Sequence, residues 1–276
     1  MVNLGQAQNF VYEHGTLWER ALFSYLFDGG SLERLHQCLR VYKNEDNGFG
    51  HRFEHDLSFP GSNSVALEYL LSTLRRFHVP IGDLLEGTAQ WLESCMAEDG
   101  TITPPDGLAD YPIAPWWREW GGQPTPDSIV GNLAHFGKAS SPLLDSTQKW
   151  VSSHLTEDDI QQIEWLFMAY HPYDYYTAIE DTPEHDVRLQ ATYNRLAELA
   201  QSMPIEQAYS LFAFVPGPDA PLAKMIPDVV EKALDHLEKT QESKGHWRDQ
   251  HGLAQWYPMV TIGNLYALKQ FGRLQV

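Results

Sequence analysis

The stretch after the first glycine-rich turn holds the densest group of side chains able to transfer protons. It reads Gly-Phe-Gly-His-Arg-Phe-Glu-His-Asp and contains His51, Glu54 and Asp56. On an extended segment Glu54 and Asp56 point the same way, because side chains two residues apart share a face. Such a pair beside an imidazole can share a proton, act as acid and base, or hold a divalent cation. We predict that these three residues are catalytic; the alternative is that the acids cap helix 62–77 or loop amides while His51 packs.

A second group is aromatic and lies on a proline-rich loop. It contains Tyr111, Trp116 and Trp117, with Trp120 close behind. Two adjacent indoles on a proline-stiffened loop cannot both face one core at low cost, so at least one is expected to line a cavity. Their flat faces suit a sugar ring, an isoprenoid chain or a carbocation. The alternative is that these rings only fill space in the interior.

A third group spans residues 171–186 and combines His171, tyrosines and acids such as Asp174. Tyrosines beside acids can bind the hydroxyl groups of a sugar or polarise a leaving group. The segment matches no repeated turn, however, and this favours the interpretation that it is an ordinary surface connection.

Pairs of helices joined by a turn must position these groups. Apolar residues recur at helical spacing over 31–43 and 62–77, on either side of a turn at Gly48. The same arrangement surrounds Gly100, between 84–96 and 128–137, and Gly245, between 227–241 and 260–271. Further helices are expected at 7–27, 142–153, 156–170, 184–202 and 204–214.

The repeated pattern predicts an all-α protein. Val-Gly-Asn-Leu at 130–133 and Ile-Gly-Asn-Leu at 262–265 mark equivalent helices, and no stretch alternates as a strand does. No flexible linker divides the chain, so we predict a single domain over residues 1–276. Its clearest repeats lie near 31–77, 84–137 and 227–272.

The last repeat carries polar and aromatic side chains at positions that correspond to the first two groups. If the helix pairs close into a ring, corresponding turns gather at one end and surround one opening. The substrate-binding residues predicted on this basis are Tyr111, Trp116, Trp117, His246, Trp247, Trp256 and Tyr257.

Composition excludes several classes of protein. The formal charge of -18 repels nucleic acids and anionic membranes, and no apolar stretch reaches the roughly 18 residues of a membrane span. The start of the chain lacks a secretion signal, so we expect a cytoplasmic protein in which Cys38 and Cys95 are buried thiols. Histidine and cysteine spacings match no tight zinc site, while weak binding of magnesium or calcium by acids stays open. The cofactor and the oligomeric state are left undetermined.

The turns resemble those of squalene–hopene cyclases and protein prenyltransferase β-subunits. The resemblance rests on Asn44–Phe49, Ala97–Gly100 and Gln241–Trp247, where a glycine is expected to adopt a positive φ and an aromatic ring to fill the gap between helix pairs. It implies an α/α toroid of about five to six helix pairs. The chain also resembles small bacterial prenyltransferase-like proteins, through Gly-Phe-Gly-His-x-x-Glu-x-Asp at 48–56 and Ala-Pro-Trp-Trp at 114–117.

The motifs that perform chemistry in that family are absent from the sequence. There is no Asp-x-Asp-Asp run, no Asp-Asp-x-x-Asp motif and no Asp-x-Cys zinc ligand set. Three functions therefore remain open. The first is an enzyme acting on a small, hydrophobic, isoprenoid-type substrate by acid/base or cation-assisted chemistry in an aromatic-lined axial cavity. The others are a carbohydrate hydrolase or lyase on the same fold, and a non-catalytic repeat protein that binds a partner.

Overall fold

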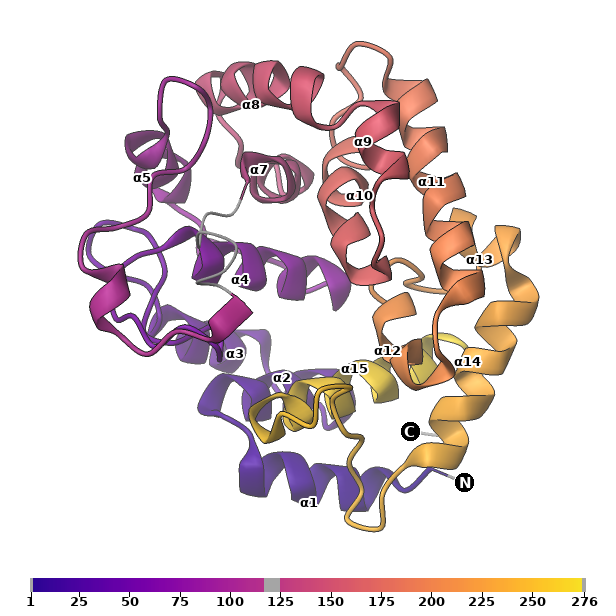
Figure 1. Cartoon of the computed structure of the whole chain (residues 1–276). Coiled ribbons are helices and arrows are strands. Elements are labelled where there is room, and N and C mark those ends of the chain that lie inside the picture. Colours follow the sequence, from indigo (N-terminus) through magenta and orange to yellow (C-terminus); the bar gives the residue numbers. More distant parts are fainter. Residues whose placement is uncertain (1, 117–124, 275–276) are drawn as a thin grey trace. The chain divides into compact units, whose positions relative to one another are not determined.

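The computed structural model describes residues 2–116 and 125–274, and Figure 1 shows that helices dominate these ranges. Within them the extended segments form only isolated bridges, between Lys43 and Phe49, Leu57 and Ile113, and Met96 and Ile102. The predicted all-α class is therefore confirmed. None of the described helices is long and apolar enough to cross a membrane.

The chain forms two compact units. Unit 1 comprises residues 1–38, 164–168 and 193–276, and unit 2 comprises residues 39–163 and 169–192. Both units draw on segments that are far apart in the sequence, so neither corresponds to one continuous stretch. The single domain and the closed toroid expected from the sequence stay predictions.

Unit 1 contains the helices from both ends of the chain. They are α1 (Leu4–His14), α2 (Leu17–Phe27), η3 (Ile205–Gln207), α12 (Ala208–Leu211), α13 (Pro221–Met225), α14 (Pro227–Thr240), η4 (Ala254–Trp256) and α15 (Tyr257–Gln270). Helices α3 (Leu32–Arg40) and α11 (His185–Ser202) have residues in both units, as does the short η2 (Leu166–Ala169).

Helix α15 forms the centre of unit 1, where it contacts α1, α2, α12 and α14 (Figure 1). Lys269 Nζ donates a hydrogen bond of 2.6 Å to the carbonyl oxygen of Leu26 at the end of α2. The turn before α15 packs on α1: a Cβ on Gly245, whose φ is +91°, would collide with the backbone of Gln6 and Ala7. Only glycine fits this turn. Other residues rarely adopt that φ, and their Cβ would lie in the space that the backbone of α1 occupies.

Unit 2 is built around α7. Its helices are α4 (Ser64–Arg76), α5 (Thr88–Cys95), η1 (Leu108–Asp110), α7 (Pro126–His135), α8 (Ser141–His154), α9 (Glu157–Gln161) and α10 (Tyr170–Tyr176). Helix α7 contacts α4, α8 and α10 (Figure 1). Its apolar residues Ile129, Val130 and Leu133 are fully buried. A helix surrounded in this way gives the side chains at its start a fixed position in the interior.

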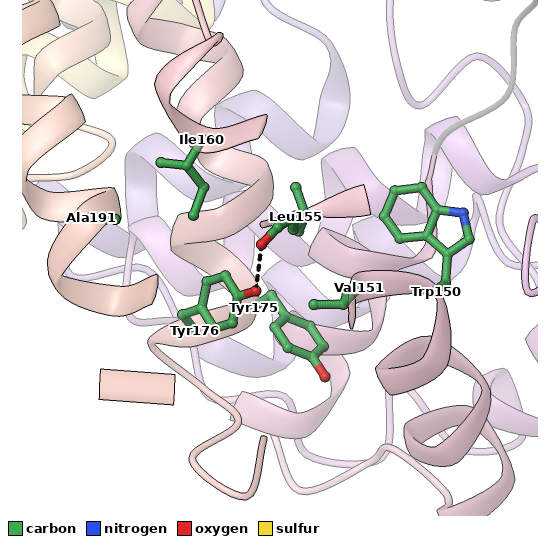
Figure 2. Close-up of a cluster of buried hydrophobic side chains, with 7 residues drawn as sticks. All are labelled: Trp150, Val151, Leu155, Ile160, Tyr175, Tyr176 and Ala191. Atoms are coloured by element: carbon green, nitrogen blue, oxygen red, sulfur yellow. Dashed lines mark hydrogen bonds between the residues drawn. The ribbon is translucent and has the colours of Figure 1, made fainter. Parts of the chain in front are cut away.

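A cluster of apolar side chains holds α10 against α8 and α9 (Figure 2). Tyr175 and Tyr176 of α10 are 1% and 0% exposed, and they pack with Val151, Leu155 and Ile160. The Tyr176 hydroxyl donates to the carbonyl oxygen of Leu155 at 2.8 Å, so burial leaves its polar atom satisfied. Helix α10 is therefore anchored to α8 and α9 by apolar packing.

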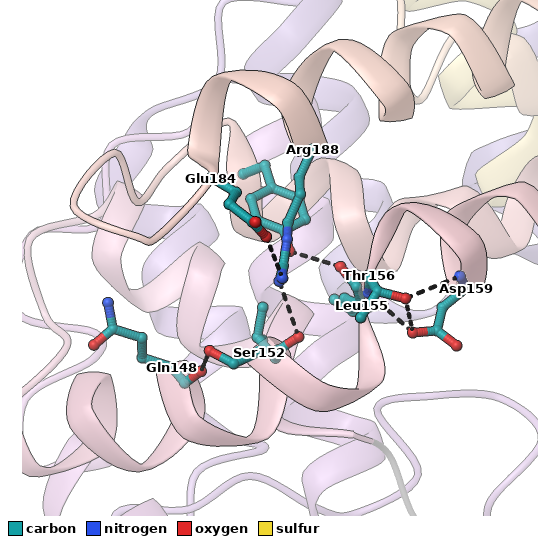
Figure 3. A network of polar contacts seen from close by, with 9 residues as sticks. Gln148, Ser152, Leu155, Thr156, Asp159, Glu184 and Arg188 are labelled. Carbon is teal, nitrogen blue, oxygen red and sulfur yellow. Dashed lines mark hydrogen bonds and ion pairs between the residues drawn. The ribbon is translucent and has the colours of Figure 1, made fainter.

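A buried arginine strengthens the same anchor (Figure 3). Arg188 donates to the Tyr176 hydroxyl at 3.2 Å and to the Glu184 carboxylate at 2.9 Å. At the start of α9, Thr156 and Asp159 form a capping box. These contacts fix the chain on both sides of α10.

Several predicted helices differ from the observed ones in extent. The helix expected over 156–170 is wrong: only Glu157–Gln161 is α-helical before η2 and α10 begin. The helix expected over 204–214 is shortened to η3 and α12. The predicted helical range 7–27 falls on two helices, because α1 ends at His14 and α2 begins at Leu17.

The turn glycines behave differently from one another. Gly100 and Gly245 have φ values of +85° and +91°, as predicted, but in the first turn the positive φ falls on Asn47, at 71°. Gly48 is needed for space instead, because a Cβ there would collide with Ser62 and Trp91. A repeated sequence pattern thus serves two physical requirements.

Candidate active site

The centre of the candidate site is an aspartate–histidine pair between α7 and α10. Thr125 precedes α7, Pro126 occupies its first turn, and Asp127 follows with its side chain fully buried. Asp127 Oδ2 lies 3.1 Å from His171 Nδ1, and the His171 side chain is 17% exposed. The Thr125 hydroxyl donates a hydrogen bond to Asp127 Oδ1, and its Oγ1 lies 3.2 Å from His171 Nδ1. The N-terminus of a helix favours a negative charge, so this position suits an ionised Asp127.

Each member of the pair stabilises the charged form of the other. Burial alone would raise the pKa of Asp127, but the His171 imidazolium and its hydrogen bond hold that pKa below its ordinary value. Burial likewise opposes the charged form of His171, but Asp127, with Glu68 and Asp174 nearby, raises the His171 pKa to about 9. At neutral pH His171 therefore carries both ring protons, with Nδ1 ion-paired to Asp127 Oδ2 at 3.1 Å and within hydrogen-bond distance of the Thr125 hydroxyl at 3.2 Å.

Glu68 of α4 lies beside this pair and is only 7% exposed. Ser128 Oγ donates to its Oε1, and the Tyr170 hydroxyl donates to its Oε2 at 3.4 Å. Burial raises the pKa of Glu68 to about 7, against the opposing influence of His171 and the Ser128 hydrogen bond. A carboxyl group with this pKa is present in both protonation states near pH 7, which is the condition for general acid and base catalysis.

Glu54 is a second buried carboxyl group close enough to affect the first. Its side chain is 6% exposed, and its Oε2 accepts the amide of Asp56 at 2.9 Å. Burial, followed by the charges of Asp56 and Glu68, raises the pKa of Glu54 to about 8. Glu54 is therefore mostly protonated at neutral pH.

A fourth buried acid, Asp174, lies one turn beyond His171 on α10. Its Oδ2 accepts Asn132 Nδ2 at 2.8 Å, and its Oδ1 lies 3.4 Å from Nη1 of Arg75. Burial raises the pKa of Asp174 to about 6, while Arg75 acts in the opposite direction. Asp174 is thus mainly ionised at neutral pH, when it faces the guanidinium.

The charges of the cluster explain why some acids stay protonated. Four buried carboxyl groups face two cationic side chains, those of Arg75 and His171. Full ionisation would leave a net negative charge in a medium of low polarity, which is strongly unfavourable. Protonation of Glu54, and partly of Glu68, relieves this excess.

The predicted catalytic trio is brought together only in part. Residues 51–56 form turns, so the prediction of an extended segment is wrong; His51 and Arg52 have positive φ values of 58° and 60°. His51 is exposed, and its Nε2 lies 2.8 Å from Asn44 Oδ1. Glu54 also binds a loop amide, as the alternative interpretation supposed. The catalytic role of His51, Glu54 and Asp56 stays a prediction.

Backbone hydrogen bonds join the aromatic loop to the segment that carries Asp56. The amide of Ser58 donates to the carbonyl of Pro112 at 3.0 Å, and the amide of Ala114 donates to the carbonyl of Asp56 at 2.9 Å. Tyr111 is 38% exposed and meets Phe59 edge-on, with ring centroids 5.2 Å apart.

Of the two adjacent tryptophans predicted to bind substrate, the structure describes only Trp116. Trp116 is partly buried, whereas Trp117 lies outside the described residues, as does Trp120. The first two groups of candidate residues are therefore neighbours in unit 2, as far as they are described.

The predicted C-terminal residues belong to unit 1. His246 stacks between Phe10, at 4.2 Å, and Tyr257, at 5.3 Å, and burial lowers its pKa. Trp247 is 3% exposed, and its Nε1 donates to the Leu237 carbonyl. Tyr257 and Trp256 are partly buried. The gathering of these side chains with those of unit 2 stays a prediction.

The structure overturns the interpretation of residues 171–176 as a surface connection. They form most of α10, in which Pro172, Asp174, Tyr175 and Tyr176 are buried. Their sequence contained the signal, since two adjacent tyrosines and a histidine three residues before an aspartate suit a buried polar helix. Glu68 and Asp127 gave no such signal, because each is the only acid in its helix.

Among the described residues, no group of three or more His, Cys, Asp or Glu side chains is arranged to hold a metal ion. Cys38 is buried as predicted, Cys95 is only partly buried, and both are free thiols. Comparison with models of known protein families finds none that matches this chain, and comparison with curated proteins finds no similar sequence.

Proposed function

We propose that unit 2 contains the active site of an enzyme that transfers protons to and from an uncharged organic substrate. The observation that supports this most directly is Glu68, a carboxyl group with a pKa of about 7 that two hydroxyl donors orient beside His171. Structural acids are commonly buried as ion pairs. A buried acid that changes protonation state near pH 7 is typical of catalytic sites.

The roles follow from the protonation states. His171 is the cationic acid: Asp127 holds Nδ1, so Nε2 is the nitrogen that gives a proton and later recovers one. Glu68 is the second group, which donates when protonated and accepts when ionised. Asp127 remains ionised throughout and stabilises the imidazolium. A site with a cationic acid beside a partly ionised carboxyl group can move a proton from one face of a substrate to another.

The substrate class is inferred from burial and charge. The cluster already holds more acidic than basic groups, so an anionic substrate is disfavoured. Aromatic residues neighbour two of these acids in the sequence: Phe53, which precedes Glu54, packs against Tyr42 and against Tyr69, which follows Glu68, with ring centroids 5.0 and 5.6 Å apart. A hydrophobic, isoprenoid-type molecule suits such surroundings and agrees with the resemblance of the turns.

The carbohydrate alternative requires a different arrangement. Glycoside hydrolysis uses two carboxyl groups about 5 to 10 Å apart on either side of the sugar. Glu54 and Glu68 are both more than nine-tenths buried, which is unfavourable for two acids that must flank an extended, hydrated chain. The third function, a non-catalytic binding protein, is an outcome of the experiment below.

Isotopes from the solvent can test the proposal before the substrate is known. The protein is incubated in D₂O with a panel of uncharged polyprenes, and in H₂¹⁸O with a panel of oligosaccharides; products are analysed by mass spectrometry. We expect one deuterium per turnover in an isoprenoid product. Substitution of either Glu68→Gln or His171→Gln should lower the rate by about 100-fold or more. Deuterium in a polyprene product, with no ¹⁸O in the oligosaccharides, supports the proposal.

Controls separate chemistry from folding. His154→Gln removes a histidine of unit 2 that stacks on Trp150 at 4.4 Å, and it should leave turnover unchanged. Variants of His51 and Asp56 measured alongside decide whether the predicted trio takes part. Label from water in the oligosaccharides would favour the carbohydrate enzyme. No label in either panel, with saturable binding of a polyprene, would contradict catalysis and leave a binding protein.

A further inference from the structure

Helices α7 and α10 touch backbone to backbone at Gly131. A Cβ at this position would lie 2.6 Å from the carbonyl oxygen of Asp174 and 2.8 Å from Cα of Tyr175. Both of these are backbone atoms, so the neighbour cannot give way by changing a side-chain rotamer. The absence of a side chain at Gly131 lets the two helices approach closely, but a smooth contact of this kind does not by itself prevent sliding.

Two polar pairs flank this contact. On one side Asp127 meets His171, with 3.1 Å between Oδ2 and Nδ1. On the other side Asn132 Nδ2 donates to Asp174 Oδ2 at 2.8 Å. On α10, His171 and Asp174 are three residues apart and so share one face of the helix. The second pair therefore limits sliding of the helix that carries His171.

Asn132 also connects the pair to α4. Its Oδ1 accepts Nη1 of Arg75 at 3.0 Å, and the same nitrogen donates to the Asp174 carbonyl at 3.1 Å. Arg75 Nη2 donates to Thr177 at the end of α10. The guanidinium can only donate and the carboxylate can only accept, so these neighbours fix the orientation of the Asn132 amide.

We propose that Asn132 is a positioning residue: by joining Arg75 to Asp174 it holds α10 on α7 in the register that keeps the His171 ring on Asp127. The inference rests on the proposed function in treating His171 as the reacting group. The geometry that it concerns can be measured without any substrate. Asn132 acts through Asp174 and α10, and it is not itself placed on the reacting atoms.

The test exchanges the two side chains. Asn132→Asp alone places a second carboxylate against Asp174 and should separate the helices. Asn132→Asp combined with Asp174→Asn restores a donor opposite an acceptor and keeps one carboxylate beside Arg75. The readout is the ¹H–¹⁵N NMR signal of the His171 Nδ1–H that faces Asp127, assigned by its loss in His171→Gln. We expect the signal to disappear or move upfield in the single variant and to return in the double variant.

Matched variants separate positioning from general stability. Asn264→Asp makes the same change in the Ile-Gly-Asn-Leu sequence of unit 1, and it should leave the His171 signal unchanged. If Asn132→Asp does not fold, Arg75→Lys serves as the second variant. It keeps the positive charge but loses the planar guanidinium that donates to both Asn132 and Thr177, so it should weaken the His171 signal in a folded protein. A folded Asn132→Asp or Arg75→Lys variant with an unaltered His171 signal would overturn the proposal. So would a double variant that fails to restore the signal.

Turnover distinguishes this proposal from the proposed function. In the deuterium assay the single variant should lower kcat by about 100-fold with little change in KM, because a displacement of about 1 Å has an effect of that size. The double variant should recover most of the loss. If the wild-type protein shows no turnover while the NMR signal responds as expected, the proposed function fails and the register role of Asn132 stands. If turnover occurs and Asn132→Asp leaves both kcat and the signal unchanged, the positioning role fails.

Discussion

Glu54 and Glu68 show how burial changes the chemistry of an ordinary side chain. Neither lies in a sequence motif known to bind a cofactor, yet their surroundings raise the pKa values to about 8 and about 7. For Glu54 the largest cause is burial, and the neighbouring acids add to it. Such groups cost stability when they ionise, so each should be detectable as a pH dependence of folding.

Glu54→Gln tests this cost. Because the folded pKa of Glu54 is raised, its contribution to stability is fully present below the unfolded pKa of about 4.3 and is lost as the pH rises through about 8. We expect the free energy of unfolding of the wild-type protein to fall relative to the variant between about pH 5 and 8. The difference in unfolding free energy between the two proteins should grow by up to about 1.4 kcal/mol for each pH unit in this range. Urea unfolding at several pH values measures it.

The control for this prediction is Glu98→Gln in the exposed turn before Gly100. It should follow the wild-type pH dependence closely, since surface substitutions rarely change stability by more than about 0.5 kcal/mol. Parallel curves for the wild-type protein and Glu54→Gln would show that Glu54 does not hold its proton on folding.

The His171 ring gives a second prediction at the scale of a residue. Asp127 is the main group that raises the pKa of His171 to about 9, against the effect of burial. In Asp127→Asn we expect this pKa to fall to about 6.5 or lower. Burial disfavours the imidazolium, and the variant lacks the main negative charge that stabilises it. NMR titration of the ring carbon-bound protons measures the change. A pKa that stays near 9 would show that other acids hold the charge.

At the scale of the element, glycine in a helix has opposite consequences in two places. Gly131 faces the backbone of α10, whereas a Cβ on Gly5 of α1 meets only the Asn3 side chain, at 3.6 Å. Gly131→Ala should destabilise the protein by about 1–3 kcal/mol through overpacking. Gly5→Ala should stabilise it by up to about 1 kcal/mol through helix propensity. Urea unfolding of both variants measures the contrast, and equal effects would contradict the close contact of α7 and α10.

The two Gly-Asn sequences make a similar comparison between α7 and α15. Asn132 is bonded on both sides by Arg75 and Asp174, whereas Oδ1 of Asn264 is buried without a hydrogen-bond partner among the described residues. Asn132→Leu should cost about 1–3 kcal/mol, because it leaves buried polar groups unpaired. Asn264→Leu should be neutral or stabilising, since it removes an unsatisfied atom. Thermal unfolding of the two variants checks this, and a large loss in Asn264→Leu would reveal a partner.

For the whole molecule, the sequence predicts local features better than long-range ones. The apolar spacing gives most helices, such as α4, which lies within the predicted range 62–77. The division into two units depends on contacts between segments such as 1–38 and 193–276, which no local pattern records. The same holds for the candidate site. His51 stood out because its neighbours in the sequence are polar, whereas Glu68, Asp127 and His171 come together only through packing of three helices.

The net charge gives a final prediction for the whole molecule. A formal charge of -18 makes acidic side chains repel one another in the folded state. Salt screens surface charges strongly: the screening length falls from about 30 Å at 0.01 M to about 8 Å at 0.15 M. We therefore expect the temperature of unfolding to rise over this range. The buried acids are screened much less, so Glu54→Gln should shift the temperature by a similar amount at both salt concentrations. A Glu54→Gln effect that disappears in salt would show that Glu54 responds to the surface charge and not to its burial.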